Sequence, residues 1–528
     1  MNNSLEPQEA INAEGSGTLT GYDYIIVGAG SAGCVVARRL VENTDARVLV
    51  LEAGGSDAGI ESISNPLRWL ENIGSAHDYL YQYQPTPHLN NRVIYVPRGK
   101  VLGGSGSINA MIWARGHQDD YNGWAAAGNT GWDYNSVLPL FKKIEDWEGG
   151  ETLFHGAGGP IHVENPKDFH RVDASFIEAG ISYGMPYVED TNGPKPEGVG
   201  PLSMTIAHGK RCSPFGGYLK PVLNRKNLSL ITEAKVLKLN LVGNRCIGLD
   251  YLHKDKVVTV TANQEVILCA GAIETPRILM LSGIGDAHEL HKLGIKAKVD
   301  LPGVGKNLQD HPLVSLTYEA KEPLGQLTYN LGGSNLLWKS SPAAPKSDLM
   351  LVPIQVGIET DEIREKYSLP PNAFSVFVTL VDVKSKGYIK LRSSDSDGPL
   401  EIQPNLISET RDLEALANAV QLCVDLAMQP ALKNIMKRWA APANVMSRRE
   451  IIAFIKDACS TYFHPVGTCS MGVGKDAVVT NQLKVYGLEG LRIADASIMP
   501  QIPTANTNAP TLMIGEFASE LLLGKRKI

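Results

Sequence analysis

The chain has few cysteines and no hydrophobic run long enough to cross a membrane. Its seven cysteines in 528 residues are scattered and include no C-x-x-C pair. This usage is typical of reduced thiols and argues against a disulfide framework or a cysteine zinc site. No stretch approaches the roughly 18 consecutive apolar residues of a transmembrane helix. The expected location is therefore the cytoplasm.

An excess of charge of one sign is also missing. The chain has 50 Lys and Arg against 56 Asp and Glu, a formal charge of -6. This balance provides no electrostatic footprint for nucleic acid or for an anionic membrane surface. Residues 1–22 contain no Lys or Arg. That segment fits neither a secretory signal nor a mitochondrial presequence, and it is predicted to be a disordered leader.

Two catalytic motifs of common hydrolases are lacking. The sequence has no Gly-x-Ser-x-Gly and no His-Glu-x-x-His, so serine hydrolase and zinc protease functions have no support. We also expect no metal site. Glycine, in contrast, is abundant: 52 residues, about a tenth of the chain against a usual share of roughly 7%. Tight turns and close backbone approaches are therefore expected.

The segment after the leader has the pattern of a strand, a turn, a helix and a second strand. Residues 24–27 and 47–51 are short apolar runs, and residues 31–40 place apolar side chains at helical spacing. Two strands with one helix between them in about 30 residues predict a parallel pair with a crossover helix.

The turn between the first strand and the helix contains a dinucleotide fingerprint. Gly28, Gly30 and Gly33 form Gly-x-Gly-x-x-Gly, directly after a strand and at the start of a helix, where free N–H groups can bind phosphates. Glu52 at the end of the next strand suits a ribose hydroxyl pair. Its negative charge disfavours a 2′-phosphate, so FAD or NAD is expected in preference to NADP.

Further elements follow from short apolar patterns. Strands at 228–231, 235–241, 257–260 and 265–269 are expected to form a meander or to join the first sheet. Residues 375–381 predict an antiparallel sheet. A helix is expected at 409–428 and a strand at 491–495. A last helix is expected to open in 506–511, with an Asn before Pro as its cap, and to extend to residue 522.

Four other segments are distinctive: 103–109 (Gly-Gly-Ser-Gly-Ser-Ile-Asn), 271–285, 464–469 (His-Pro-Val-Gly-Thr-Cys), and 495–497 with 506–511 (Asn-Thr-Asn-Ala-Pro-Thr). With the glycine turn they resemble the glucose–methanol–choline (GMC) oxidoreductases, a family of FAD-dependent alcohol oxidases and dehydrogenases. The resemblance runs from about residue 22 to the C-terminus. It is greatest to the choline dehydrogenase-like and alcohol dehydrogenase-like branch.

The resemblance implies an α/β fold with a Rossmann-like FAD-binding domain and a second, substrate domain built on an antiparallel sheet. The FAD-binding domain is expected to comprise 22–165, 220–312 and 465–528, and the substrate domain 166–219 and 313–464.

The resemblance also assigns cofactor contacts. Gly28, Gly30, Gly33 and Glu52 would bind the ADP half of FAD. Gly104, Ser105 and Asn109 would lie beside the flavin, Val236 would contact the adenine side through its backbone, and Asp495 would meet the ribityl or pyrophosphate region. Covalent members of the family have a flavin-linked His in the glycine-serine loop where this chain has Ile108. Noncovalent FAD is therefore implied.

For catalysis, His464 matches the active-site base of the family. An alcohol does not lose its proton unaided at neutral pH, and imidazole titrates in the range needed for a base. Asn508 matches the second active-site position, where an amide can hold the substrate oxygen, and it can also cap the last helix. For His311, after Asn-Leu-Gln-Asp, the residues favour a structural role.

The expected reaction is oxidation of a primary alcohol to an aldehyde by hydride transfer to flavin N5, with electrons passed to a quinone or other carrier. Two alternatives stay open: an oxygen-dependent oxidase that produces hydrogen peroxide, and a flavin-dependent lyase or photoenzyme on the same scaffold. A quinone partner leaves peripheral membrane association open. A quaternary ammonium substrate would need an aromatic or acidic cage, and the sequence identifies none.

Overall fold

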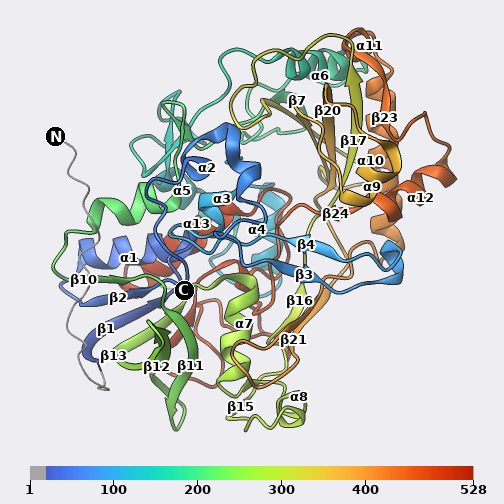
Figure 1. Cartoon of the computed structure of the whole chain (residues 1–528). Helices are drawn as coiled ribbons and strands as arrows, with labels where there is room; N and C mark the ends of the chain where they lie inside the picture. Colours follow the sequence, from blue (N-terminus) through green and yellow to red (C-terminus); the bar gives the residue numbers. More distant parts are fainter. Residues whose placement is uncertain (1–18, 527) are drawn as a thin grey trace.

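Two seven-stranded sheets organise the protein (Figure 1). The computed structural model describes residues 19–526 and 528, so nearly all of the predicted leader lies outside the described residues. Helices and strands alternate through much of the chain, and the predicted α/β class is confirmed.

The first sheet contains the glycine turn. Its strand order is β10 (Leu228–Ile231), β2 (Val48–Leu51), β1 (Leu19–Val27), β13 (Lys256–Leu268), β12 (Arg245–His253) and β11 (Lys235–Val242), and β25 (Leu491–Ile493) also pairs with β13. The pairing of β1 with β2 is parallel, as predicted, and helix α1 (Ser31–Asn43) connects them. Strands β11, β12 and β13 form an antiparallel meander that joins this sheet, so the two expected arrangements occur together.

The prediction of separate strands at 257–260 and 265–269 is wrong, because β13 runs through both without a break. Its first half pairs with β12 up to Thr261, whereas pairing with β1 runs from Val260 onward and pairing with β25 from Val266 onward. The polar residues in the middle of β13 therefore remain in the strand, since pairing partners follow one another along its length.

Helices cover one face of the first sheet. Helix α1 packs against α13 (Asn508–Leu522), and α5 (Tyr134–Ile144) lies next to α13 (Figure 1). Between α1 and α13, the Arg39 guanidinium donates to the buried Glu516 carboxylate through Nε at 2.8 Å and Nη2 at 2.6 Å. This ion pair connects the first helix of the chain to the last one.

The second sheet is antiparallel throughout, which confirms the prediction for 375–381. Its strand order is β23 (Met436–Ala441), β17 (Pro312–Ala320), β20 (Ala373–Leu380), β19 (Leu349–Ile354), β18 (Ser334–Trp338) and β7 (Gly198–Pro201), and β24 (Ser460–Thr461) also pairs with β17. Helices α6 (Arg171–Ser182) and α10 (Thr410–Ala427) pack on one face, and α11 (Pro430–Ile435) contacts α6.

Side chains of the second sheet alternate between two apolar clusters, as strand geometry requires. On β20, Phe374 belongs to the main core under the helices, whereas Phe377 belongs to a separate cluster. On β19, Leu351 faces the main core, and Val352 and Ile354 face the separate cluster. The second sheet therefore presents one apolar face to its helices and another to the centre of the molecule.

Shorter elements complete the chain. The helices are α2 (Glu61–Ser64), α3 (Ser105–Ile108), α4 (Gln118–Ala126), α7 (Gly271–Leu281), α8 (Ala287–Lys292), α9 (Asp361–Tyr367) and α12 (Arg448–Ala458), with 3₁₀ turns at Pro66–Asn72, Pro87–Leu89, Lys220–Val222 and Ala496–Ile498 and a π turn at Phe215–Leu219. The strands are β3 (Tyr81–Tyr83), β4 (Ile94–Val96), β5 (Glu145–Trp147), β6 (Ile161–Val163), β8 (Ile206–Ala207), β9 (Lys210–Arg211), β14 (Ile284–Gly285), β15 (Val299–Asp300), β16 (Lys306–Leu308), β21 (Gly387–Leu391) and β22 (Leu400–Gln403).

The two sheets draw their strands from alternating parts of the chain. Strands of the first sheet fall within 22–165, 220–312 and 465–528, except that β1 begins three residues earlier. Strands of the second fall within 166–219 and 313–464, apart from Pro312. The division into two domains stays a prediction. All seven cysteines are free thiols. Within residues 19–526, no helix has the length and apolar character that crossing a membrane requires.

Candidate active site

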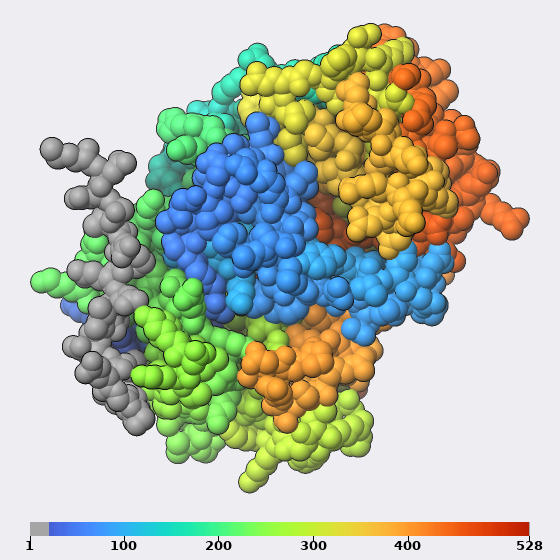
Figure 2. Space-filling model, in the orientation of Figure 1, coloured from blue at the N-terminus to red at the C-terminus, as the bar shows by residue number. Residues whose placement is uncertain are grey.

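A cavity of about 1020 Å³ extends from the glycine turn to the second sheet. Its walls include Val27 and Leu51 at the ends of β1 and β2, and Val352 and Phe377 of the second sheet. In Figure 2 the early part of the chain, in blue, crosses this side of the molecule between the green segments of the first sheet and the yellow-to-orange segments of the second. The volume is at the upper end of the range for ligand and cofactor pockets.

The glycine turn leaves room for a ligand at the start of α1. A Cβ on Gly33 would meet the Gly28 carbonyl oxygen at 1.9 Å, so the helix can pack this closely on the turn only with glycine. A Cβ on Gly30, in contrast, would lie 4.0 Å from its nearest described neighbour, the Cys269 carbonyl oxygen, and Gly30 lines the cavity. The space beside Gly30 is thus cavity space, next to the helix N–H groups that favour phosphate.

Glu52 connects the end of β2 to this turn. Its carboxylate accepts hydrogen bonds from the backbone N–H groups of Ala29 and Gly54, each at 2.8 Å. Burial raises the pKa of Glu52 to about 7, against the opposing effect of these N–H donors. A carboxylate has about four acceptor sites, so it can still accept hydrogen bonds from ribose hydroxyls while both backbone bonds are kept.

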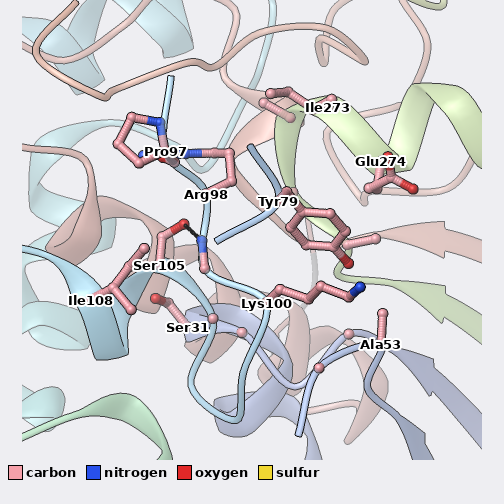
Figure 3. A pocket seen from close by; sticks show the side chains of 18 of the residues that line it. Ser31, Ala53, Tyr79, Pro97, Arg98, Lys100, Ser105, Ile108, Ile273 and Glu274 are labelled. Atoms are coloured by element: carbon pink, nitrogen blue, oxygen red, sulfur yellow. Dashed lines mark hydrogen bonds between the residues drawn. The ribbon is translucent and has the colours of Figure 1, made fainter. Parts of the chain in front are cut away.

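The glycine-serine loop forms the next part of the wall. Gly104, Ser105, Ile108 and Asn109 all line the cavity, and Figure 3 shows Ser105 and Ile108 on the same side of the pocket as Ser31. Ser105 Oγ accepts from the Gly99 N–H at 3.1 Å. These side chains come from α3 and the residues next to it, so one short helix sets their positions together.

Asp495 follows β25 and holds the start of α7. One carboxylate oxygen accepts from the Gly271 N–H at 2.9 Å and from Thr275 Oγ1 at 2.6 Å, and the other accepts from the Ser497 N–H at 2.8 Å. Burial raises the pKa of Asp495. Of the nine predicted cofactor contacts all but Gly33 line the cavity: Gly28, Gly30, Glu52, Gly104, Ser105, Asn109, Val236 and Asp495. The open space at Gly30 and this donor set fit a dinucleotide.

His464 lies between the cofactor half of the cavity and the second sheet. Its Nδ1 is 3.0 Å from Nδ1 of His311, and its Nε2 is 3.2 Å from Nδ2 of Asn506. Its backbone N–H donates to Asp310 at 2.8 Å. An amide nitrogen can only donate, so His464 Nε2 is the acceptor in that contact. The proton of a neutral His464 is then on Nδ1 and points to His311.

Burial lowers the pKa of His464 well below its usual value of 6.5, and the nearby His311 and Arg98 lower it further. Burial likewise lowers the pKa of His311 to about 3. Both imidazoles are therefore neutral near pH 7, and His464 is available as a free base. The sequence favoured a structural role for His311, but the structure places it against the candidate base. The only feature of the sequence that could have pointed to this contact is the position of His311 directly before β17.

The two asparagines of the 506–511 segment have different partners. Asn508, the first residue of α13, accepts a hydrogen bond from Ser31 Oγ at 2.8 Å through Oδ1. The amide of Asn506, which the sequence analysis did not single out, is the one that reaches His464. The predicted Asn cap of α13 is wrong: the N-cap is Thr507, with no side-chain cap bond, because Asn508 turns to α1 instead. Asn506 and Asn508 are two residues apart in one motif, so the sequence could not tell which faces the base.

Beyond His464 most of the cavity wall is apolar, with Asn330 as a polar neighbour of Trp69 and Ala110. The Tyr462 ring lies 4.7 Å from the His464 ring, centroid to centroid, and the Phe377 ring lies 6.3 Å from that of Tyr462. Trp69 Nε1 donates to the Asn330 carbonyl at 2.9 Å, so its polar atom is satisfied. We define the apolar compartment as nine of the lining residues: Trp69, Ile73, Ala110, Ile112, Leu202, Val352, Ile354, Phe377 and Tyr462.

Comparison with known proteins gives one consistent result. Two family models described as GMC oxidoreductase match residues 22–313 and 383–515. The chain is 38% identical to the mitochondrial choline dehydrogenase of Mus musculus, over 95% of this chain and 89% of the relative. It is 37% identical to an alcohol dehydrogenase [acceptor] of Pseudomonas putida, over 96% of both. Among solved structures, the pyridoxine 4-oxidase of Mesorbium loti superposes with a TM-score of 0.91 at 31% identity, over 96% of this chain and 100% of that one.

Proposed function

The chain belongs to the GMC oxidoreductases and is an enzyme of FAD-dependent alcohol oxidation, and we propose that it converts a primary alcohol to an aldehyde and passes the electrons to a quinone or other carrier. The relatives support the alcohol, since two of them are named choline dehydrogenase and alcohol dehydrogenase [acceptor]. We prefer a carrier over oxygen as the electron acceptor because the second of these relatives is named a dehydrogenase with an acceptor. One hydride leaves carbon and one proton leaves oxygen for each aldehyde formed.

FAD would be held by this chain's glycine turn, by Glu52 and by the loop that contains Ser105. FAD supplies the acceptor for the hydride when it is bound. Ile108 lines the cavity at the loop position where covalent members of the family have His, and an isoleucine side chain has no atom that can form a flavin link. We therefore propose noncovalent binding. Acid precipitation of the holoenzyme should leave all of the flavin in the supernatant, and flavin in the pellet would contradict this.

His464 is the proposed base. Its Nε2 is directed to Asn506 and borders the cavity, and the lowered pKa keeps this atom unprotonated at neutral pH. It can therefore accept the hydroxyl proton as the hydride leaves carbon. General base catalysis of this kind contributes typically about 10²–10⁴-fold in rate.

Asn506 is the proposed holder of the substrate oxygen. Its Nδ2 already lies within hydrogen-bond distance of His464 Nε2, so an oxygen that reaches one of these atoms is close to the other. An amide N–H donates to an alkoxide-like oxygen but does not compete for its proton. We assign to Asn506 the role that the resemblance gave to Asn508, because the Asn506 amide is the one that contacts His464. Asn508 also lines the cavity, and its bond with Ser31 engages Oδ1, which leaves Nδ2 able to donate.

His311 is the proposed positioning residue. The Nδ1 atoms of His311 and His464 are 3.0 Å apart and must share one proton. With His311 as the acceptor, the proton of His464 stays on Nδ1, which leaves Nε2 free for the substrate. One observation carries the proposed function. A base, an amide and a positioning histidine lie together between a dinucleotide cradle and an apolar compartment.

The same arrangement weighs against the lyase or photoenzyme alternative. A base next to an amide donor is the pair that deprotonation of an alcohol needs, whereas a cofactor used only by light or for structure needs neither. The oxidase alternative differs from the proposed function only in the electron acceptor, which would be oxygen. Hydrogen peroxide formed with air as sole acceptor, at a rate equal to that with a quinone, would support the oxidase.

The test is the visible spectrum of the FAD-loaded protein, recorded without oxygen before and after addition of aliphatic and aryl alcohols. We expect the flavin band to bleach with at least one class and the matching aldehyde to form in equal amount. A flavin band that no alcohol bleaches would overturn alcohol oxidation as the function. A protein that binds no FAD would contradict the cofactor assignment itself.

A further inference from the structure

We propose that the substrate is an uncharged alcohol with an apolar body, aromatic or branched aliphatic, which the apolar compartment receives, and that a quaternary ammonium alcohol of the same shape is selected against. The inference rests on the proposed function, because it names the substrate class for the same site. It starts from the chemistry of the wall beyond His464.

The second sheet supplies much of that wall from one face. Val352 and Ile354 alternate with residues of the main core along β19, and Phe377 does the same on β20. Val352 pairs directly with Phe377 in the sheet register. Because paired residues on neighbouring strands project to the same face, these side chains form one continuous apolar surface at the end of the cavity.

The rest of the compartment continues this surface. Ile112 and Leu202 come from two segments that pair with each other through the Ile112–Met204 bridge, and Tyr462 connects the surface to His464. Trp69 adds a third ring to those of Phe377 and Tyr462. Six of the nine residues are aliphatic and cannot offset the lost hydration of a cation, so the faces of the three rings are the groups of the compartment that could attract one.

The acidic residues of the cavity are at its other end. Six acids line it: Glu52, Glu233, Asp255, Glu274, Asp397 and Asp495. All belong to elements around the first sheet or to α7, except Asp397, whose carboxylate forms an ion pair with Lys235 at the start of β11. None of the described lining residues on strands of the second sheet carries a charge, and the polar Asn330 lies beside the compartment with its amide donating to the Ala110 carbonyl. A cationic substrate head would thus find its counter-charges in the cofactor half.

Two charged groups lie near the base: Arg98 lines the cavity, whereas Asp310, which accepts from the His464 N–H, does not. Arg98 lines the cavity, is visible beside Pro97 in Figure 3, and donates to the Phe463 carbonyl next to His464. Its charge lowers the pKa of His464, so its field reaches the position where the substrate oxygen binds. A second cation close to that position would be repelled by the same field.

One buried acid lies behind the sheet surface. Glu359 is outside the cavity wall, and its Oε1 accepts from Thr317 Oγ1 at 2.5 Å, next to Ser375. Burial raises its pKa well above the usual value, which disfavours the charged carboxylate. Because Glu359 is also outside the cavity wall, it is a poor counter-charge for a substrate, and the balance of the site favours a neutral body.

Choline and 3,3-dimethylbutan-1-ol provide the test, because they have the same shape and differ in one atom, a charged nitrogen in place of a carbon. We would measure the rate constant of flavin reduction and Kd for each alcohol by anaerobic stopped-flow with the FAD-loaded enzyme. We expect the ratio of rate constant to Kd to be about tenfold or more higher for the neutral alcohol, from desolvation of the ion.

The outcomes separate the inference from the function on which it rests. If choline reduces the flavin as well as the neutral alcohol or better, the inference is overturned and alcohol oxidation stands. If neither compound nor benzyl alcohol nor any primary aliphatic alcohol reduces it, the proposed function fails, and the inference with it. Calorimetric titration of the FAD-loaded His464→Ala variant adds a readout without turnover, in which we expect binding of the neutral alcohol only.

A matched pair of variants on β20 tests whether the compartment is the place of selection. Phe377→Leu removes a ring from the cavity face, and Phe374→Leu removes a ring from the opposite face of the same strand. We expect the preference for benzyl alcohol over ethanol to fall about threefold or more in Phe377→Leu, and to stay unchanged in Phe374→Leu. If the preference for benzyl alcohol over ethanol were the same in the two variants, the substrate body would not lie in the compartment.

Discussion

His464 lies where burial removes the water that would otherwise stabilise its protonated form. Its neighbours add to this effect, because His311 and Arg98 both lower the pKa of its side chain. The result is an imidazole that is a free base at neutral pH and has a defined tautomer, with Nδ1 directed to His311 and Nε2 to Asn506.

Replacement of His464 by alanine tests its role as base. We expect His464→Ala to retain bound FAD, because the cradle is formed by other residues, and to lose about 10²–10⁴-fold in the rate of flavin reduction by an alcohol. Anaerobic stopped-flow absorbance gives the rate, and the flavin-to-protein ratio gives the retention. Undiminished reduction in this variant would remove His464 from the mechanism.

The lowered pKa of His464 predicts an unusual pH dependence. A base whose pKa lies well below 6.5 stays unprotonated as the pH falls through 6.5. The ratio of the reduction rate constant to Kd should therefore stay constant from about pH 8 to about pH 5.5, whereas an ordinary histidine would lose activity below about pH 6.5. Benzyl alcohol suits this measurement because it does not ionise in that range. A break between pH 6 and 7 would show that the base has an ordinary pKa.

At the scale of elements, each part of the site is fixed by the end of a strand or the start of a helix. Glu52 follows β2 and Asp495 follows β25, so both carboxylates lie at the same edge of the parallel part of the first sheet. This is the edge at which α/β folds bind ligands. Helix α13 begins beside the cavity, which places Asn506 just before it at the same location.

Glu52 is expected to contribute to FAD affinity through the ribose. Loss of a hydrogen bond to a charged group costs about 1.5–3 kcal/mol, so Glu52→Ala should weaken FAD binding by about 10- to 100-fold. Titration of the FAD-free protein with FAD, followed by flavin fluorescence, measures this. Glu52→Gln keeps the shape of the side chain and one acceptor oxygen. Its FAD affinity should therefore lie between those of the unchanged protein and Glu52→Ala. Equal FAD affinity in all three proteins would show that Glu52 does not hold the cofactor.

The start of α13 offers a direct comparison of two asparagines. Asn506→Ala removes the amide that faces His464, and we expect the rate of flavin reduction to fall by about 10²-fold, as for loss of one donor to a developing oxyanion. Asn508→Ala removes the bond to Ser31 and should change that rate by much less. Stopped-flow reduction of both variants with one alcohol decides between them. The reverse order would return the catalytic role to Asn508.

For the whole molecule, the cavity lies between two sheets, so a ligand that fills it connects both halves. A ligand that binds only the folded state stabilises it by about 2.7 kcal/mol at a concentration 100 times its Kd. We expect the melting temperature of the FAD-free protein to rise by several degrees when FAD is added, as measured by differential scanning calorimetry. FMN lacks the ADP half that the glycine turn and Glu52 would bind, and should raise it far less. Equal shifts would argue against a dinucleotide cradle.

The sequence alone predicted the features that depend on neighbours in the chain. The first strand, turn, helix and strand were predicted correctly because their pairing and their glycine requirement arise within about 30 residues. The antiparallel pattern of β20 and the long helices α10 and α13 were also readable from local periodicity. The family motifs identified FAD, and they identified His464 as a candidate.

Only the tertiary structure decided which side chains meet. Asn506 and Asn508 share one motif, and the direction of each is set by α1 and by His464, more than 40 residues away. His311 meets His464 across 153 positions of sequence, so no local pattern could reveal the pair. The apolar compartment likewise combines residues from Trp69 to Tyr462. Hydrogen bonds within one turn or strand are encoded locally, whereas a pocket exists only after distant strands have packed.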